Sequence, residues 1–153
     1  MSRRAQIAMS ADEQAAFVAS QRVVVCATNG PRGWPHQMPL WYVVRDREVW
    51  AWSYAKSQKV RNLERDSRAT LQIEDGDQYQ ELRGVMIEAR ATIHRDPELL
   101  VEFGAELMVR YGGDATGQDF MDAVRAQAAK RVALQFIPER VASWDHRKLA
   151  GVY

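Results

Sequence analysis

The chain has 153 residues, of which 46% are hydrophobic and 27% charged, and its formal net charge is +1. These values predict a single domain over residues 1–153 and give no sign of a nucleic-acid partner. No apolar stretch approaches the roughly 18 residues that a membrane span requires. Cys26, the one cysteine, cannot form an internal disulfide and is expected to be buried and inert. No apolar signal core follows the basic N-terminus, so a cytoplasmic protein is expected.

The first predicted element is a short helix over residues 12–21. Ser10 and Glu13 have the spacing of a capping box, in which each side chain bonds the backbone N–H of the other residue. The buried face of this helix is expected to comprise Ala15, Phe17 and Val18.

Three strands are predicted next, with short connections between them. Residues 22–28 (RVVVCAT) form a continuous β-branched run, which predicts burial on both faces. A turn at residues 29–33 leads to a strand over residues 35–44, whose prolines indicate an edge or a bulge at its start. Residues 48–54 (EVWAWSY) then alternate between two faces. These strands form an antiparallel meander.

The second half of the chain alternates between helical and strand patterns. Asp96 and Pro97 begin one helix, and Gly112 and Gly113 stop it. The other predicted helices cover residues 56–66 and 118–129. The remaining predicted strands cover residues 68–74, 83–94, 131–137 and 139–144. Six or seven strands, mostly consecutive, with three or four helices predict an antiparallel barrel decorated with helices and not a parallel βαβ sheet.

The segment with the clearest chemical signal is 54–63 (YAKSQKVRNL), where a strand leads directly into a helix. Ser57 is a good cap residue, and the cations Lys56, Lys59 and Arg61 follow around the first turn. Each exposed cation there is disfavoured by roughly 0.3–1 kcal/mol by the helix dipole. Such an arrangement favours a bound anion, so this turn is a candidate phosphate site. A solvated helix start with incidental charges is the alternative.

Two further segments are candidates for ligand contacts. Residues 35–41 (PHQMPLW) combine prolines with an aromatic, and they either present backbone groups to a flat ring or form an edge strand. Residues 143–149 (SWDHRKL) form a polar, aromatic tail, which is either frayed or docked across a dimer interface. In the second case the tail supplies Trp144 and Arg147 or Lys148 to a neighbouring subunit's site.

Other catalytic chemistry has little support in the sequence. His36, His94 and His146 lack ligand spacing, so no metal is expected. Nucleotide-binding and serine-hydrolase motifs are absent. A bound cofactor that performs the chemistry is therefore favoured, and no catalytic residue is assigned, with Tyr54, Tyr79 or a water left open as proton donor.

Four segments in order resemble one family: VVVCATNGPRGWPHQMPLW, YAKSQKVRNLERDSRATLQIED, RGVMIEARATI and RVASWDHRKLAG. The chain resembles the pyridoxamine-phosphate-oxidase-like split β-barrel superfamily, and within it the F420-dependent flavin/deazaflavin oxidoreductases of the B class. The resemblance implies a mainly-β split barrel (the FMN-binding split barrel) with peripheral helices. It also implies a homodimer with two cofactor sites at the subunit interface.

The resemblance also implies site residues. The phosphate is expected at the strand-to-helix turn and the flavin-like ring beside the proline-rich strand. The C-terminal residues are expected to approach the site from the partner subunit. The implied cofactor-binding residues are Gln37, Met38, Pro39, Trp41, Lys56, Ser57, Lys59, Arg61, Asn62, Trp144 and Arg147.

The expected cofactor is coenzyme F420, with FMN as the alternative. The FMN-dependent oxidases proper carry an R-x-V-L-L-K pattern before the turn, where this chain reads EVWAWSY. Coenzyme F420 carries a phosphate within a longer acidic tail, which suits the added basic groups. The expected activity is hydride transfer from reduced F420 to a small electron-poor organic substrate. The alternatives are an FMN-dependent oxidoreductase and a non-catalytic binder of flavin, deazaflavin or haem, with His36 or His146 as the axial ligand for haem.

Overall fold

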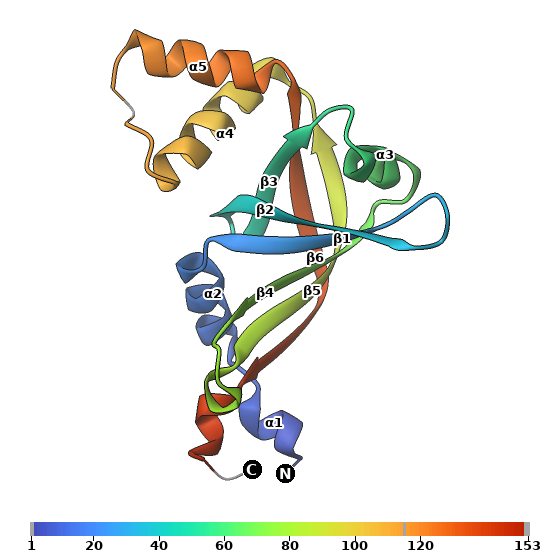
Figure 1. Ribbon diagram of the computed structural model, residues 1–153, viewed down its shortest axis with the longest axis vertical. Coiled ribbons are helices and arrows are strands. Elements are labelled where there is room, and N and C mark those ends of the chain that lie inside the picture. Colours follow the sequence, from blue (N-terminus) through green and yellow to red (C-terminus); the bar gives the residue numbers. More distant parts are fainter. Residues whose placement is uncertain (1, 115, 152–153) are drawn as a thin grey trace.

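Six antiparallel strands close into a barrel in the computed structural model, which describes residues 2–114 and 116–151 (Figure 1). Around the barrel the strands follow the order β1–β2–β3–β6–β5–β4. Their bounds are β1 Val23–Asn29, β2 Pro35–Arg45, β3 Glu48–Tyr54, β4 Arg68–Asp75, β5 Arg83–His94 and β6 Arg131–Asp145. The predicted mainly-β barrel is confirmed.

Helices lie at both ends of the molecule and on both sides of the strands (Figure 1). Their bounds are α1 Arg3–Ile7, α2 Ala11–Ser20, α3 Gln58–Arg65, α4 Pro97–Arg110 and α5 Gln118–Ala128, with short 3₁₀ turns η1 Tyr79–Glu81 and η2 His146–Leu149. The predicted caps are present at Ser10, Ser57 and Asp96. The sequence did not predict α1. Among the described residues, none of the helices combines the length and apolarity that crossing a bilayer demands.

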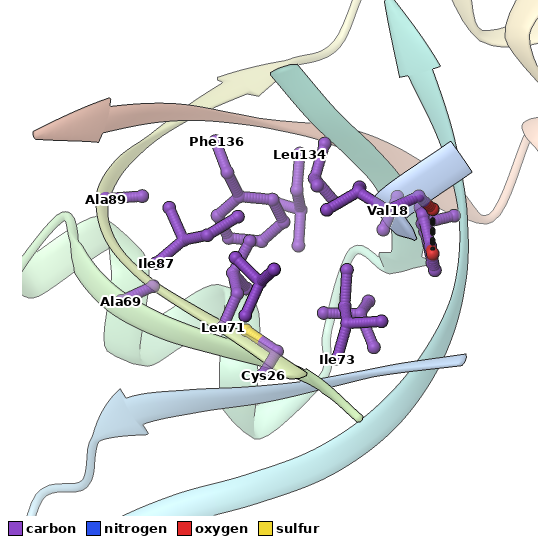
Figure 2. Packing of buried hydrophobic residues seen from close by; sticks show 14 of the residues in the cluster. Val18, Cys26, Ala69, Leu71, Ile73, Ile87, Ala89, Leu134 and Phe136 are labelled. Atoms are coloured by element: carbon purple, nitrogen blue, oxygen red, sulfur yellow. Dashed lines mark hydrogen bonds between the residues drawn. The ribbon is translucent and has the colours of Figure 1, made fainter. Parts of the chain in front are cut away.

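The barrel interior holds the main hydrophobic core (Figure 2). Inward-pointing side chains from β1, β4, β5 and β6 meet there, among them Cys26, Leu71, Ile87, Leu134 and Phe136. α2 packs against this core, and the carbonyl of Val18 accepts a 2.5 Å hydrogen bond from Tyr42 Oη. The predicted burial of Phe17 and Val18 is confirmed, whereas Ala15 is half-buried.

A second core lies between the barrel and α4. Trp50 from β3 packs there against Phe103 and Leu107 of α4 and Ala133 of β6. This part of the sheet is therefore covered on both faces, which explains why Trp50 is buried although it alternates with the barrel-facing side chains of β3.

Two strand predictions were wrong. β1 was expected to be buried on both faces, but its burial alternates and Val23 is 46% exposed. Residues 131–137 and 139–144 were expected to form two strands, but β6 is continuous, and a bulge near Pro138 absorbs the irregularity that the proline imposes.

An uncharged row crosses the outer face of five strands. The strand registers place side by side the residues Pro39, Val25, Gln72, Met86 and Ala142 of β2, β1, β4, β5 and β6. Their neighbours along β1, β4 and β5 belong to the barrel core, so this outer row points away from it. All five members are exposed or half-buried.

Candidate cofactor site

A groove of about 530 Å³ joins the two segments that the sequence singled out. This volume lies within the range of small-molecule sites, about 300–1,000 Å³. Its walls come from β2, from the end of β3, from the first residues of α3 and from the start of β6. The lining residues are His36, Met38, Pro39, Leu40, Trp41, Trp52, Ser53, Tyr54, Ser57, Gln58, Lys59 and Arg131.

The first turn of α3 forms the polar end of the groove. Ser57 caps the helix, because its Oγ accepts from the backbone N–H of Val60 (3.3 Å). The same Oγ lies 3.0 Å from Ser53 Oγ at the end of β3. The strand and the helix are thus tied together at the point where two hydroxyl groups and a helix N-terminus face the groove.

Lys59 places a buried amine beside these hydroxyl groups. The residue is 4% exposed, and Nζ donates a 3.2 Å hydrogen bond to Ser53 Oγ. Among residues 2–114 and 116–151, Lys59 forms no ion pair with a carboxylate. Burial lowers the pKa of Lys59 below its ordinary value of 10.5, while burial raises the pKa of the neighbouring Cys26 thiol to about 12. A protonated, buried amine without a counter-ion is costly, and an anion in the groove removes that cost.

His36 has a buried ring nitrogen without a hydrogen-bond partner among the described residues, and it lines the groove. Its Nδ1 is buried, and no group in the described part of the chain forms a hydrogen bond with it. Because buried polar atoms are nearly always satisfied, this nitrogen also indicates a ligand or water in the groove.

Aromatic rings line the remaining wall. Trp41 stacks on Tyr111 with ring centroids 4.3 Å apart, which fixes the tryptophan at the edge of the groove. Trp52 and Tyr54 point from β3 toward Arg131, whose guanidinium carbon lies 4.9 and 4.1 Å from the two ring centroids. The groove thus combines flat apolar surfaces with cationic groups.

Five of the predicted residues line this groove together. They are Met38, Pro39, Trp41, Ser57 and Lys59.

The structure places the other predicted residues of these two segments elsewhere. Gln37 lines a separate depression on the outer face of the barrel, while Lys56 and Arg61 are exposed and do not line the groove. Asn62 is fully buried, and its amide donates to Thr28 Oγ1 (3.0 Å) and accepts from Gln58 Nε2 (2.8 Å). In the described structure Asn62 therefore anchors α3 to β1.

Trp144 and Arg147 lie away from the groove of their own chain. Figure 1 shows η2 at the opposite end of the molecule from α3 and α5. The ring of Trp144 covers Gly84, and Arg147 forms a two-pronged ion pair with Asp145 (2.8 and 2.6 Å), which lowers the pKa of that carboxyl group. Lys148 Nζ bonds the carbonyl of Ala8 and the carboxylate of Glu13. Of the two alternatives for residues 143–149, the frayed tail is therefore wrong, and docking across a dimer interface stays a prediction.

Sequence reasoning did not find Arg131, Trp52 or Ser53 as lining residues. Ser53 and Trp52 belong to a strand that it predicted, but their place in the groove depends on how that strand meets α3. Arg131 pairs with Tyr54 in the β3–β6 register, and nothing in the sequence reveals that pairing. Among the described residues no group of three histidine, cysteine or acidic side chains is placed to hold a metal ion.

Comparison with known proteins shows the family and the fold. A family model described as pyridoxamine 5'-phosphate oxidase matches residues 10–145. The crystal structure of a conserved hypothetical protein from Mycobacterium tuberculosis is 42% identical with a TM-score of 0.90, covering 100% of this chain and 95% of that one. No curated protein matches the chain.

More distant structures share the fold. An F420 reductase is 22% identical with a TM-score of 0.67, covering 83% of this chain and 94% of that one. A haem storage protein from Vibrio cholerae is 18% identical with a TM-score of 0.67, covering 87% and 94% of the two chains.

Proposed function

The chain belongs to the pyridoxamine 5'-phosphate oxidase family, and from this premise we propose that it is an oxidoreductase dependent on coenzyme F420. The proposed reaction moves a hydride from the reduced coenzyme to a small electron-poor organic substrate. The family relation supports a flavin-like cofactor, and the groove of this chain supports one that carries anionic groups.

The buried Lys59 amine carries the proposal. Its hydrogen-bond partner is a neutral hydroxyl group, and it forms no ion pair with a carboxylate in the described part of the chain. A phosphate at this position would accept from Lys59, from Ser57 and from the N-terminal N–H groups of α3. The residues present therefore fit the phosphate of either F420 or FMN.

Two observations favour the deazaflavin over FMN. The strand before the phosphate turn is EVWAWSY, which lacks the arginine and lysine of the FMN-dependent oxidases proper. The groove also contains a second cation, Arg131, which can hold an anionic group beyond the phosphate. A longer acidic tail supplies additional anionic groups.

The chain itself contributes binding and orientation. When bound, the reduced deazaflavin supplies the hydride. Ser57 and Lys59 hold the phosphate, and Trp41 and Met38 provide apolar surface beside a flat ring. No lining residue is assigned as proton donor.

We further propose that the protein acts as a homodimer whose outer rows face each other. Pro39 belongs both to the outer row and to the groove, so a second copy seated on the row approaches the groove. Trp144 lies on the same face as Ala142, two residues further along β6. In the proposed dimer Trp144 and Arg147 contribute to the partner's groove.

A fluorescence titration of the purified protein with F420, run beside FMN and haem, tests the cofactor assignment. Saturable binding of F420 that is tighter than binding of FMN or haem is expected. The reduced coenzyme is then tested with a panel of electron-poor acceptors. Preference for FMN, or no binding of F420, contradicts the proposal.

His36 favours one alternative function. Its buried Nδ1 lacks a partner among the described residues, and a ring nitrogen in a groove with aromatic walls is also suited to bind haem iron. A non-catalytic haem binder would show a Soret shift on titration that His36→Ala removes. It would show no turnover with any acceptor.

A further inference from the structure

Arg131 is a cationic residue of the groove that has no role in the phosphate site proposed at Lys59 and the first turn of α3. It begins β6 and pairs across the sheet with Tyr54, the last residue of β3. Its guanidinium lies over Tyr54 and Trp52, at 4.1 and 4.9 Å from the ring centroids. The side chain is thus fixed by two aromatic rings before any ligand binds.

The hydrogen bonds of Arg131 leave much of its donor capacity free. Nη1 donates to the backbone carbonyl of Gln127 (3.2 Å) and to the side-chain oxygen of Gln127. Both acceptors are neutral, and across residues 2–114 and 116–151 Arg131 takes part in no ion pair. Guanidinium presents five N–H donors, so those on Nε and Nη2 have no acceptor in the described protein.

Other arginines of this protein show what is missing at Arg131. Arg45 and Arg83 also lie over aromatic rings, but each is paired with a carboxylate, at 2.5 and 2.7 Å. Arg22 and Arg110 resemble Arg131, since they lie over rings and donate to backbone carbonyls, but neither lines the groove. Arg131 is held in the groove wall with no such partner. A pre-positioned guanidinium with free donors is suited to bind a carboxylate or phosphate in a planar, two-pronged geometry.

We propose that Arg131 is a second anion anchor of the groove, separate from Lys59, and that it selects ligands that carry more than one anionic group. The inference rests on the proposed function, since it assigns Arg131 to the acidic tail of the coenzyme while Lys59 and Ser57 hold the phosphate. The proposal predicts that the groove distinguishes F420 from FMN by the number of anionic groups, because F420 carries anionic groups beyond its phosphate and FMN does not.

The test measures affinities by fluorescence titration for three probes: F420, FMN, and the deazaflavin chromophore without phosphate or tail. Arg131→Met keeps an unbranched apolar chain in the place of the arginine stem and removes the donors. Lys130→Met is the matched control, because it removes the same charge from an exposed position next to Arg131 that does not line the groove. Circular dichroism and thermal unfolding check that each variant is folded.

Arg131→Met is expected to bind F420 roughly tenfold or more weakly, as expected for the loss of a charge-assisted contact. Its affinities for FMN and for the bare chromophore should stay within about twofold, as should all affinities of Lys130→Met. The F420 affinity of Arg131→Met should also decline less steeply with salt than that of the parent. Arg131→Lys, which keeps the charge, is expected to recover part of the F420 affinity and provides a second variant if Arg131→Met is unstable.

The outcomes separate the two proposals. If the parent binds F420 and Arg131→Met binds it equally well, the anchor is refuted while the proposed function stands. If Arg131→Met weakens F420, FMN and the bare chromophore by the same factor, Arg131 shapes the groove and does not select by charge, which also refutes the inference. A parent that does not bind F420 refutes the proposed function, and the inference that rests on it is refuted as well.

Discussion

Lys59 carries its charge at a position where the described protein supplies no counter-ion. Burial lowers its pKa, so the folded state holds this proton less tightly than the unfolded chain. Burying the amine lowers the free energy of unfolding of the ligand-free protein, and binding of an anion offsets this loss. Function and stability therefore oppose each other at this residue.

We predict that Lys59→Met weakens F420 binding without lowering the stability of the ligand-free protein. The methionine fills the same space, removes the buried charge, and removes a charge-assisted contact to the phosphate that is worth roughly 1.5–3 kcal/mol. Titration and denaturant unfolding of the two proteins measure both effects. Unchanged F420 affinity in the variant would refute the phosphate site.

The lowered pKa of Lys59 also predicts a pH dependence of stability. Between the folded pKa and the unfolded value of 10.5, the unfolded chain binds more protons, so the contribution of Lys59 to the free energy of unfolding rises with pH. The parent should therefore gain stability relative to Lys59→Met as the pH increases toward 10.5. Chemical unfolding of both proteins at a series of pH values measures the difference, in which the contribution of other groups such as Cys26 largely cancels. A difference that falls with pH contradicts the assignment.

Asn62 should behave as a structural residue in the ligand-free protein. Asn62→Ala removes the partner of the buried Thr28 hydroxyl group and should lower the free energy of unfolding by about 1–3 kcal/mol. Arg61→Ala, at the exposed neighbouring position, should change it by less than about 0.5 kcal/mol. Denaturant unfolding compares the two variants, and equal stabilities would show that the amide does not anchor α3.

The site residues divide by whether local sequence determines their place. Ser57 and Lys59 were predictable, because a strand end followed by a capped helix fixes their position within one turn. Asn62 was assigned to the ligand by resemblance, and its burial against β1 depends on a tertiary contact. Arg131 was missed because its position follows from the β3–β6 register, which joins residues more than seventy positions apart.

At the scale of elements, α4 is positioned on the barrel by a glycine. A Cβ on Gly104 would lie 2.6 Å from the ring of Trp52, so the absence of a side chain lets the helix approach β3 closely. Trp52 in turn lines the groove and supports Arg131. The packing of a peripheral helix is therefore linked to the shape of the candidate site.

We predict that Gly104→Ala destabilises the protein although alanine favours the helix. The propensity gain is about 1 kcal/mol, whereas overpacking against a ring held by neighbours costs typically about 1–3 kcal/mol. The net effect should be a loss of stability together with weaker F420 binding, because Trp52 must shift. Gly112→Ala is no control, since Gly112 has a φ of 95°. Instead Glu102→Ala, on an exposed position of α4, should leave binding unchanged. A stabilised Gly104→Ala with unchanged binding would contradict the link.

The elements themselves were largely readable from the sequence, and the exceptions have physical causes. Caps and breakers such as Ser10, Asp96 and Gly112 act locally, so the helices that they delimit were predicted. The β-branched run of β1 is compatible both with a strand covered on its two faces and with a strand whose outer face is uncovered, so the sequence alone did not predict which of the two β1 is. Pro138 suggested a break in β6, but a bulge accommodates it and pairing with β5 continues.

At the scale of the whole molecule, the outer row is a feature for which a monomeric barrel has no evident use. It crosses five strands without a charge, and the groove and Trp144 lie beside it. Four of its five members are apolar, with Gln72 as the exception, and an apolar strip on a solvent-facing sheet favours association with a complementary surface. A two-fold axis through the row brings the same face of each copy together, so each proposed site gains residues from its partner.

We predict that Met86→Arg converts the protein from a dimer to a monomer. In a two-fold interface the substitution buries two unpaired charges, which should weaken association by roughly 3 kcal/mol or more, about a hundredfold. Met86 points outward, so the barrel should keep its circular dichroism spectrum, while F420 affinity should fall because Trp144 and Arg147 no longer reach the partner's groove. Sedimentation velocity over a range of concentrations measures the assembly. Val109→Arg, an apolar-to-arginine change at an exposed position of α4 outside the outer row, is the matched control and should remain dimeric. A parent that is monomeric and still binds F420 tightly would show that one chain suffices for the site.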